Sequence, residues 1–212
     1  MILLTGGSGF IGTNVQRYAA EHKIDLTVCS RNPQSQFRFR TVSCDLAQID
    51  ENFLYEYDHV IHLASYRLQE SSINPFESTS VNIMGFLNLL NASLKAGVKR
   101  VVWLSSSAVY GHQHGILDES SPVRPEGLYA AGKLYDEMLS EIYSRLGLSV
   151  IILRVPAVFG PYRRYEAMSY NDDIFKNAKC HKKVELTDGE YNLNVSWIFQ
   201  GPCFHIISGI VY

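Results

Sequence analysis

Short apolar runs alternate along the chain with longer stretches whose apolar residues have helical spacing. The runs are apolar at nearly every position, which is typical of parallel strands covered by helices on both faces. Strands that alternate with helices predict right-handed βαβ units and hence a doubly wound α/β sheet. The predicted strands are Ile2–Thr5, Leu26–Cys29, Thr41–Cys44, Val60–Leu63, Arg100–Ser105 and Ser149–Arg154, and the predicted helices are about Gly9–His22, Pro75–Ala96 and Leu128–Leu146.

The predicted helix Pro75–Ala96 has signals at both ends. Asn74 is a suitable N-cap, Pro75 suits the first helical position, and Glu77 follows three residues after the cap. Gly97 can end the helix in a left-handed conformation. Apolar residues extend most of the way round this helix, which favours burial against both the sheet and a second subunit.

Length and charge narrow the class of protein. A chain of 212 residues predicts one domain with part of a second, and 46% hydrophobic against 19% charged residues excludes a disordered or fibrous chain. The net charge of −2, without a basic block, argues against a nucleic-acid-binding protein.

The cysteines and the N-terminus suggest a compartment. Four scattered cysteines without a CxxC pair predict neither a disulfide framework nor a zinc site, and we expect no metal. The N-terminus has no cationic segment before a long apolar run, and no window approaches the ~18 apolar residues of a membrane span. We therefore expect a cytoplasmic protein that does not bind membranes.

A glycine-rich turn follows the first predicted strand and opens the first predicted helix. Gly6, Gly9 and Gly12 allow the backbone to turn tightly and to approach a pyrophosphate at the helix N-terminus. The spacing differs from G-x-G-x-x-G, so a purely structural turn is the alternative. The strand–turn–helix context favours a dinucleotide site, with Phe10 and Ile11 beside it.

The ends of the next two strands bear on the choice of dinucleotide. No acidic residue follows the second strand to bind a ribose 2′-hydroxyl, whereas Arg31 can pair with a 2′-phosphate. This favours NADP over NAD, and a solvated loop arginine is the alternative. Asp45 either accepts an adenine amino hydrogen or caps the following turn.

Tyr129 and Lys133 are spaced to lie on one helical face. A neighbouring cation stabilises phenolate and brings a tyrosine towards a useful acid/base pKa. The pair follows by about twenty residues a strand that ends in Ser105-Ser106-Ser107, whose hydroxyls would lie at the ligand-binding edge of the sheet.

In this arrangement the chain resembles the extended short-chain dehydrogenase/reductases, and within them the NAD-dependent epimerase/dehydratase family (UDP-glucose 4-epimerase-like). The resemblance implies a Rossmann-type domain, a nucleotide-sugar substrate and a homodimer built from the two longer helices. Its motifs span residues 1 to about 161. They are Thr5-Gly6-x-x-Gly9-x-x-Gly12, Asp45-Leu46, His62-Leu63-Ala64-Ser65, Asn82-x-x-Gly85-x-x-Asn88, Ser105-Ser106-Ser107-Ala108-Val109-Tyr110-Gly111, Tyr129-x-x-x-Lys133 and Arg154-x-x-x-Val158-Phe159-Gly160-Pro161.

The resemblance also implies roles for single residues. Tyr129 would be the general acid/base, Lys133 would activate it and hold the nicotinamide ribose, and Ser106, with Ser107 as fallback, would bind the substrate. The remaining roles are adenine contact for Asp45 and Leu46, lining of the cofactor cleft for Leu63 and Ala64, phosphate contact or mere surface exposure for Arg67, and structural packing for His62, Asn82 and Gly85.

Three departures from the family pattern qualify the expected activity. Ser107-Ala108 replaces the Asp-Glu pair with which 4,6-dehydratases expel water, and Ala157 replaces a frequent substrate-binding Asn. Members commonly reach about 300 residues, so we expect a cofactor domain over 1–161 and an incomplete substrate-binding cap over 162–212. The expected function is a nucleotide-sugar epimerase or reductase, and the alternative is a non-catalytic dinucleotide-binding protein or a truncated member with little turnover.

Overall fold

A six-stranded parallel sheet forms the centre of the protein. The computed structural model describes residues 1–31, 38–156, 158–159 and 198–199. The strand order is β3-β2-β1-β4-β5-β6, which confirms the predicted doubly wound, Rossmann-type sheet. The strands are β1 (Ile2–Thr5), β2 (Leu26–Ser30), β3 (Arg40–Ser43), β4 (His59–His62), β5 (Arg100–Ser106) and β6 (Ser149–Val155).

The direction of strand addition reverses between β1 and β4. Thr5, the last residue of β1, is in register with Cys29 of β2 on one side and with His62 of β4 on the other. In open α/β sheets ligands bind at this switch point, beyond the carboxyl ends of the strands.

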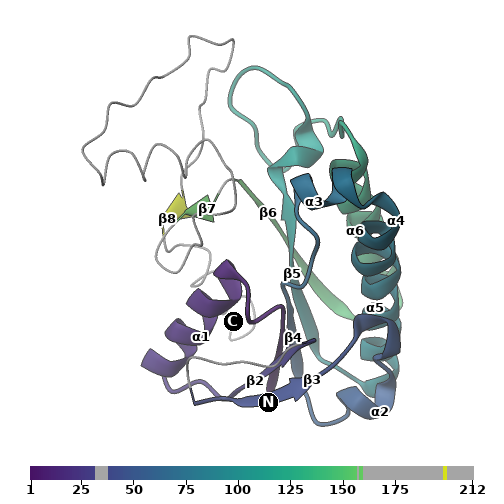
Figure 1. The fold of residues 1–212 in the computed structure, drawn as a ribbon. Coiled ribbons are helices and arrows are strands. Elements are labelled where there is room, and N and C mark those ends of the chain that lie inside the picture. The colour runs from purple at the N-terminus through teal and green to yellow at the C-terminus, as the bar shows by residue number, and fades with distance from the viewer. Residues whose placement is uncertain (32–37, 157, 160–197, 200–212) are drawn as a thin grey trace, which may run out of the picture.

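Helices cover both faces of the sheet (Figure 1). Helix α1 lies on one face, and α2, α5 and α6 lie on the other. A separate pair of short parallel strands joins β7 (Val158–Phe159) to β8 (Ile198–Phe199). The helices are α1 (Phe10–Glu21), η1 (Leu46–Gln48), α2 (Glu51–Leu54), α3 (Leu68–Ile73), α4 (Pro75–Thr79), the π-helical η2 (Ser80–Met84), α5 (Gly85–Ala96), η3 (Ser107–Tyr110) and α6 (Leu128–Arg145).

Each face of the sheet has its own apolar core. Trp103 of β5 packs against Phe86 of α5, with ring centroids 4.7 Å apart, in the cluster under α5 and α6. Val15 of α1 and Leu4 of β1 belong to the cluster on the other face. Burial of each such side chain contributes about 1.5–3 kcal/mol to folding. The two cores thus hold the sheet in place, and with it the residues at the carboxyl ends of its strands.

The predicted helix Pro75–Ala96 is a helical run with a π-helical turn, η2, in its middle. Asn74 is the N-cap residue and Pro75 the first helical residue, as predicted, but the Asn74 side chain forms no capping bond. Glu77 instead accepts a 2.5 Å hydrogen bond from the Tyr66 hydroxyl, outside the helix. Gly97 ends the run in the left-handed region (φ 73°), as predicted.

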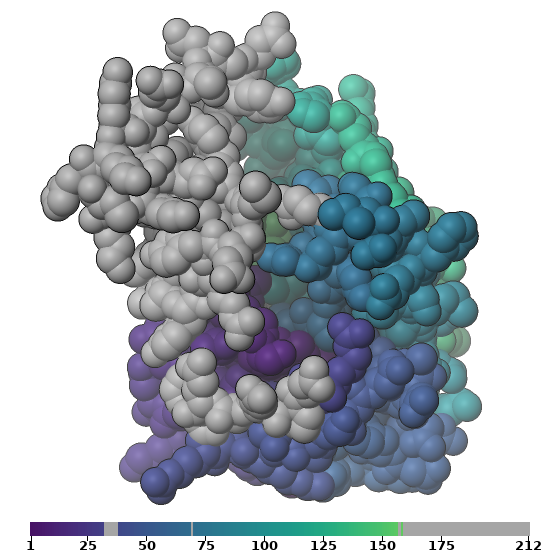
Figure 2. All heavy atoms as spheres, viewed as in Figure 1, coloured from purple at the N-terminus to yellow at the C-terminus, as the bar shows by residue number. Residues whose placement is uncertain are grey.

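Two short helices were not predicted. Helix α2 begins after Asp50, whose carboxylate accepts a 2.9 Å bond from the Phe53 amide. Helix α3 begins after Arg67, where the Glu70 carboxylate accepts a 2.9 Å bond from the Arg67 backbone amide and a 2.6 Å bond from its guanidinium. In the space-filling view α3 and α4 lie at the surface (Figure 2), where Ile73 and Phe76 are exposed.

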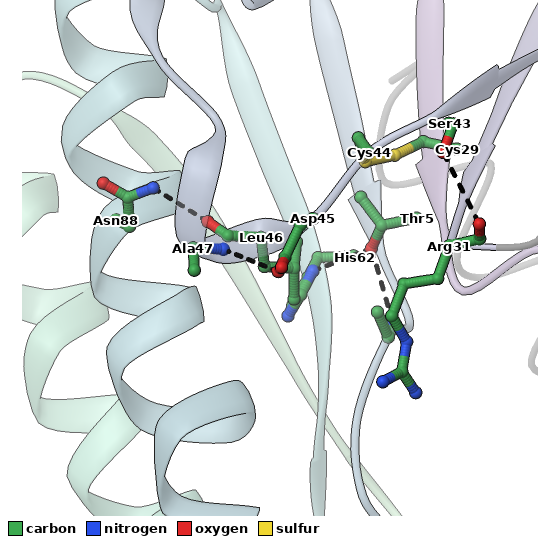
Figure 3. Close-up of a disulfide and its surroundings, with 11 residues drawn as sticks. Thr5, Cys29, Arg31, Ser43, Cys44, Asp45, Leu46, Ala47, His62 and Asn88 are labelled. Carbon is green, nitrogen blue, oxygen red and sulfur yellow. Dashed lines mark hydrogen bonds between the residues drawn. A yellow bond between two sulfur atoms is a disulfide. The ribbon is translucent and has the colours of Figure 1, made fainter. Parts of the chain in front are cut away.

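The prediction about the cysteines was wrong at one pair. Cys29 and Cys44 form a disulfide that joins the carboxyl ends of β2 and β3 (Figure 3). They are 15 residues apart in sequence, but neighbouring parallel strands bring their Cα atoms to 6.0 Å. Sequence spacing alone cannot show this proximity. Because the structure contains a disulfide, the cysteines no longer support the expectation of a reducing cytoplasm.

Several predictions concern residues beyond the described ranges. The segment Val184–Thr187, for which the sequence also predicts a strand, lies outside them. So do the contacts of Ala157, the boundary at residue 161 and nearly all of 162–212. Among the helices that are described, none has the length and apolar character needed to cross a bilayer.

Candidate active site

The glycine turn packs against the residues that follow β4. Gly6 has φ 69°, and a Cβ there would lie 2.5 Å from the Ala64 amide nitrogen. A Cβ on Gly12 would lie 2.4 Å from the Gly6 carbonyl oxygen. Glycine is therefore required at both positions.

The N-terminus of α1 points its first amides towards this turn. Gly9 is the N-cap, and no side chain caps the helix. Phe10 and Ile11, both half-buried, begin the helix. The Gln16 side-chain amide donates a 2.8 Å bond to the Gly7 carbonyl and fixes the turn. A glycine cradle at an uncapped helix N-terminus fits the pyrophosphate of a dinucleotide.

Thr5 and His62 join the glycine turn to the middle of the sheet. The Thr5 hydroxyl lies 2.8 Å from His62 Nδ1 and accepts a 3.4 Å bond from the Ala64 amide. The Leu63 amide donates to the Thr5 carbonyl at 3.2 Å. Burial, and secondarily the charge of Lys133, lowers the pKa of His62 to about 3, so its ring is neutral at physiological pH.

The structure brings Ser106 and Tyr129 together. Ser106 ends β5, Tyr129 lies in the first turn of α6, and the Ser106 hydroxyl lies close enough to the Tyr129 phenol to oppose the rise that burial causes in its pKa. The Ser106 hydroxyl also accepts a 3.1 Å bond from the Ala108 amide, which fixes its position. Ser107, the fallback candidate, is exposed. The geometry therefore favours Ser106 as the partner of Tyr129.

Lys133 lies one turn further along α6 and is only 7% exposed. Its ammonium donates a 2.9 Å bond to the Leu104 carbonyl and lies 5.1 Å from the Trp103 ring centroid. It lies 5.9 Å from the Tyr129 ring centroid. Ser106, Tyr129 and Lys133 thus gather at the carboxyl end of β5.

The expected effect of Lys133 on Tyr129 stays a prediction. Burial raises the pKa of Tyr129 above its ordinary value, and the Ser106 hydroxyl opposes that rise. The Lys133 ammonium donates to the Leu104 carbonyl and lies 5.9 Å from the Tyr129 ring centroid. A further positive charge beside the ring would favour the phenolate.

Arg31 lies at the end of β2 and is exposed. Its side chain turns away from the disulfide (Figure 3). The Tyr66 hydroxyl donates to Glu77, which raises the pKa of Tyr66, and Arg31 opposes that rise. Arg31 therefore reaches across the sheet edge from β2 towards the segment after β4. Arg67 is held differently, in a 2.6 Å ion pair with Glu70 on the surface.

Asp45 caps a turn in this structure. Its carboxylate accepts a 3.1 Å bond from the Ala47 amide at the start of η1, which is one of the two roles the sequence left open. Leu46 is buried, and its carbonyl accepts a 2.8 Å bond from the Asn88 side chain of α5 (Figure 3). Asn88 thereby fixes this turn to the helical layer.

Asn82 has the structural role that the sequence suggested. Its side chain accepts a 2.7 Å bond from the Tyr66 amide and donates to the Tyr66 carbonyl at 3.2 Å. It therefore anchors the segment after β4 to the π-helical turn. A shallow pocket beside it reaches Tyr129; its lining residues are Ser78, Thr79, Asn82, Ile83, Leu128, Tyr129 and Gly132.

Sequence reasoning missed two buried acids on α6, Asp136 and Glu137. Glu137 accepts a 2.7 Å bond from Arg154 and a 2.5 Å bond from Ser105. The Asp136 Oδ1 atom is buried and has no hydrogen-bond partner among the described residues. Their spacing of three and four residues after Lys133 was the available signal, since such residues share a helical face.

Comparisons with known proteins agree with this geometry. A putative UDP-glucose 4-epimerase of Methanocaldococcus jannaschii is 27% identical over 95% of this chain and 70% of its own length. Mouse dTDP-D-glucose 4,6-dehydratase is 30% identical over 84% of this chain, which spans 57% of the mouse protein. The solved structure of MoeE5 in complex with UDP-glucose and NAD superposes with a TM-score of 0.84 at 26% identity, covering 97% of this chain and 70% of that one.

A family model extends over most of the sequence. The model of the NAD dependent epimerase/dehydratase family matches residues 2–191, which include both the glycine turn and the Tyr129–Lys133 pair. That match covers far more than half of the 212 residues. The chain therefore belongs to the NAD dependent epimerase/dehydratase family.

Proposed function

We propose that the chain supplies the cofactor-binding and acid/base machinery of an NAD(P)-dependent nucleotide-sugar epimerase or a close reductase. The observation that carries the proposal is the close approach of Ser106 and Tyr129 next to Lys133, at the sheet edge where the glycine turn lies. A protein that only binds dinucleotides has no need of a partly buried hydroxyl pair at that position. MoeE5, similar in fold, was solved with a nucleotide sugar and NAD.

The dinucleotide would lie across the carboxyl ends of β1 and β4. The glycine turn, with Phe10 and Ile11, would hold its pyrophosphate, Leu63 and Ala64 would line its cleft, and Lys133 would hold the nicotinamide ribose. Asp45 and Leu46 would flank the adenine. When bound, the oxidised nicotinamide accepts a hydride from the sugar carbon and brings a positive charge into the site.

That positive charge would favour the phenolate of Tyr129, whose pKa burial otherwise raises. Tyr129 would then take the proton of the sugar hydroxyl while Ser106 holds the same oxygen. In the return step Tyr129 would give the proton back while the hydride returns from the reduced nicotinamide to the other face of the rotated keto sugar, which yields the epimer. Ser107 and Arg67 complete the proposed substrate contacts.

An epimerase or reductase fits better than a 4,6-dehydratase. Ser106 is followed by Ser107 and Ala108, where dehydration needs an acid to protonate the leaving hydroxyl. The relatives named above include one protein of each kind, so product analysis must decide.

Two finer features stay proposals. The first is a preference for NADP, which rests on Arg31 and on the absence of an acid after β2. The second is a homodimer through α5 and α6, because Met84, Met138 and Ile142 are roughly half exposed on these helices.

The test of the proposed function is incubation of the NAD-loaded protein with UDP-, dTDP- and GDP-sugars, with chromatographic analysis of the products. We expect an epimerised sugar with NAD alone, or a reduced sugar when NADH or NADPH is supplied in excess. A 4,6-dehydrated product would overturn the preference among reactions. Bound dinucleotide with every sugar unchanged would favour the non-catalytic alternative.

A further inference from the structure

The charge of Glu137 is already balanced. Its carboxylate accepts bonds from Arg154 Nε at 3.0 Å and 3.2 Å and from a terminal nitrogen of Arg154 at 2.7 Å. It also accepts a bond from the Ser105 hydroxyl. Glu137 is therefore committed to β5 and β6 and is a poor counter-ion for any other cation.

Asp136 has no such partner. Its side chain is 2% exposed, and its Oδ1 atom lacks a hydrogen-bond partner within the described ranges. Only its main-chain carbonyl is engaged, by the Ser140 hydroxyl at 2.8 Å. A buried carboxylate without a counter-charge is costly, so this site requires either a nearby cation or a proton.

Lys133, one turn earlier on the same helix, is a buried cation whose hydrogen-bond acceptor and ring contact carry no negative charge. Its hydrogen bond goes to the Leu104 carbonyl, which carries no net charge, and its other close neighbour is the Trp103 ring. His62 of β4 also faces it and is neutral. Other titratable groups lie on the elements that contact α6. Two are held in ion pairs, Glu70 of α3 with Arg67 and Arg154 of β6 with Glu137. The others are Lys95 of α5, which is exposed, Tyr110 of η3 and Arg100 of β5.

We propose that Asp136 is the counter-ion of Lys133 and keeps this buried lysine in its ammonium form. Asp136 is a positioning residue, because it acts on the site through Lys133. Its consequence for turnover rests on the proposed function, whereas the electrostatic interaction of Asp136 with Lys133 does not.

The two groups influence each other in a definite direction. Burial lowers the pKa of Lys133, and the Asp136 carboxylate is the foremost group that opposes this lowering. Burial likewise raises the pKa of Asp136, and Lys133 opposes that rise. Removing the carboxylate should therefore let the pKa of Lys133 fall further.

The experiment is a titration of the lysine side chains by carbon-13 NMR, with the Lys133 signal assigned by its absence in Lys133→Arg. Asp136→Asn should lower the titration midpoint of Lys133 by about one pH unit or more. Glu141→Gln is the matched control, since it removes a carboxylate from the exposed side of α6, where Glu141 pairs with Arg145. An unchanged midpoint in Asp136→Asn would overturn the proposal.

A second measurement needs no variant of Asp136 and guards against a folding defect. In the unmodified protein the carboxyl carbon signal of Asp136 should move at the pH at which Lys133 loses its proton. Independent titration of the two signals would also overturn the pair.

Activity separates this inference from the proposed function. If sugar oxidation occurs, its alkaline limit should move to lower pH in Asp136→Asn by the same shift as the NMR midpoint, and Asp136→Glu should restore part of it. If Asp136→Asn shifts the Lys133 midpoint but the unmodified protein oxidises no sugar, the proposed function is refuted and the interaction of Asp136 with Lys133 stands. If the protein oxidises sugars but Asp136→Asn leaves the Lys133 midpoint unchanged, the interaction is refuted and the proposed function stands.

Discussion

The side chains of Ser106 and Tyr129 approach each other between the carboxyl end of β5 and the first turn of α6. They are far apart in sequence and meet because α6 packs back onto β5 and β6. The Ala108 amide fixes the Ser106 hydroxyl from the other side, so the pair is held before any ligand binds. Preorganised polar groups of this kind lower the cost of orienting a substrate.

Alanine substitutions at Gly6 and Gly97, which have similar positive φ angles, should distinguish an effect on folding from an effect on cofactor binding. Gly6→Ala places a Cβ 2.5 Å from the Ala64 amide nitrogen, whereas a Cβ on Gly97 meets nothing within 4 Å. We expect Gly97→Ala to cost about 1 kcal/mol with dinucleotide affinity unchanged. Gly6→Ala should cost on the order of 3 kcal/mol and abolish binding. Urea unfolding and a dinucleotide titration would check both, and equal behaviour of the two variants would contradict this assignment.

His62 should make stability depend on pH. Burial lowers its pKa to about 3 in the folded protein, against 6.5 for the free side chain. The unfolded chain therefore binds the proton more tightly, and stability is lost as the pH falls from 6.5 towards 3. Between pH 7 and pH 5 this amounts to about 2 kcal/mol.

The check is the urea midpoint of the unmodified protein and of His62→Gln at both pH values. The variant should lose markedly less stability between them. An equal loss in both proteins would mean that His62 is already charged in the folded state.

Arg31 tests the choice of dinucleotide. If its guanidinium pairs with a 2′-phosphate, NADP(H) should bind more tightly than NAD(H), and Arg31→Ala should remove most of the difference. Arg40→Ala is the control, because it removes the same charge at the start of β3, where Arg40 pairs with Glu56. Fluorescence titration with both reduced dinucleotides measures this. Tighter NAD(H) binding by the unmodified protein would refute the role of Arg31.

The exposed apolar residues of α6 test the homodimer. We expect a dimer at micromolar concentration by light scattering, and we expect Met138→Lys with Ile142→Lys to give a monomer, since charges in an apolar interface are costly. Ile116→Lys is the control, because Ile116 is fully exposed outside the helices. A monomeric unmodified protein would contradict the prediction, as would equal dissociation in the control.

The sheet could be predicted from the sequence because each central strand is a short apolar run followed by a turn or helix. Helix α3 could not, because its two large apolar residues, Leu68 and Ile73, are both exposed and leave no buried face to detect. The π-helical turn at Asn82 was equally hidden, since a local change of helical pitch leaves the apolar pattern almost unchanged.

At the candidate site the residue types were predictable and their electrostatics were not. The spacing of Tyr129 and Lys133 shows that they share a helical face, but burial and the neighbouring groups Ser106 and Asp136 shift their pKa values. The Cys29–Cys44 disulfide depends in the same way on strand register, which is a property of the folded sheet.

The most direct test of the proposed chemistry is the rate at which bound NAD is reduced after a nucleotide sugar is added, followed by NADH absorbance. Tyr129→Phe should slow this reduction by about 10²–10⁴-fold, because the hydroxyl transfers a proton, and should leave NAD affinity nearly unchanged. Tyr135→Phe, which changes a half-exposed tyrosine of the same helix, should react like the unmodified protein. NAD reduction at equal rates in the unmodified protein and in Tyr129→Phe would contradict the account.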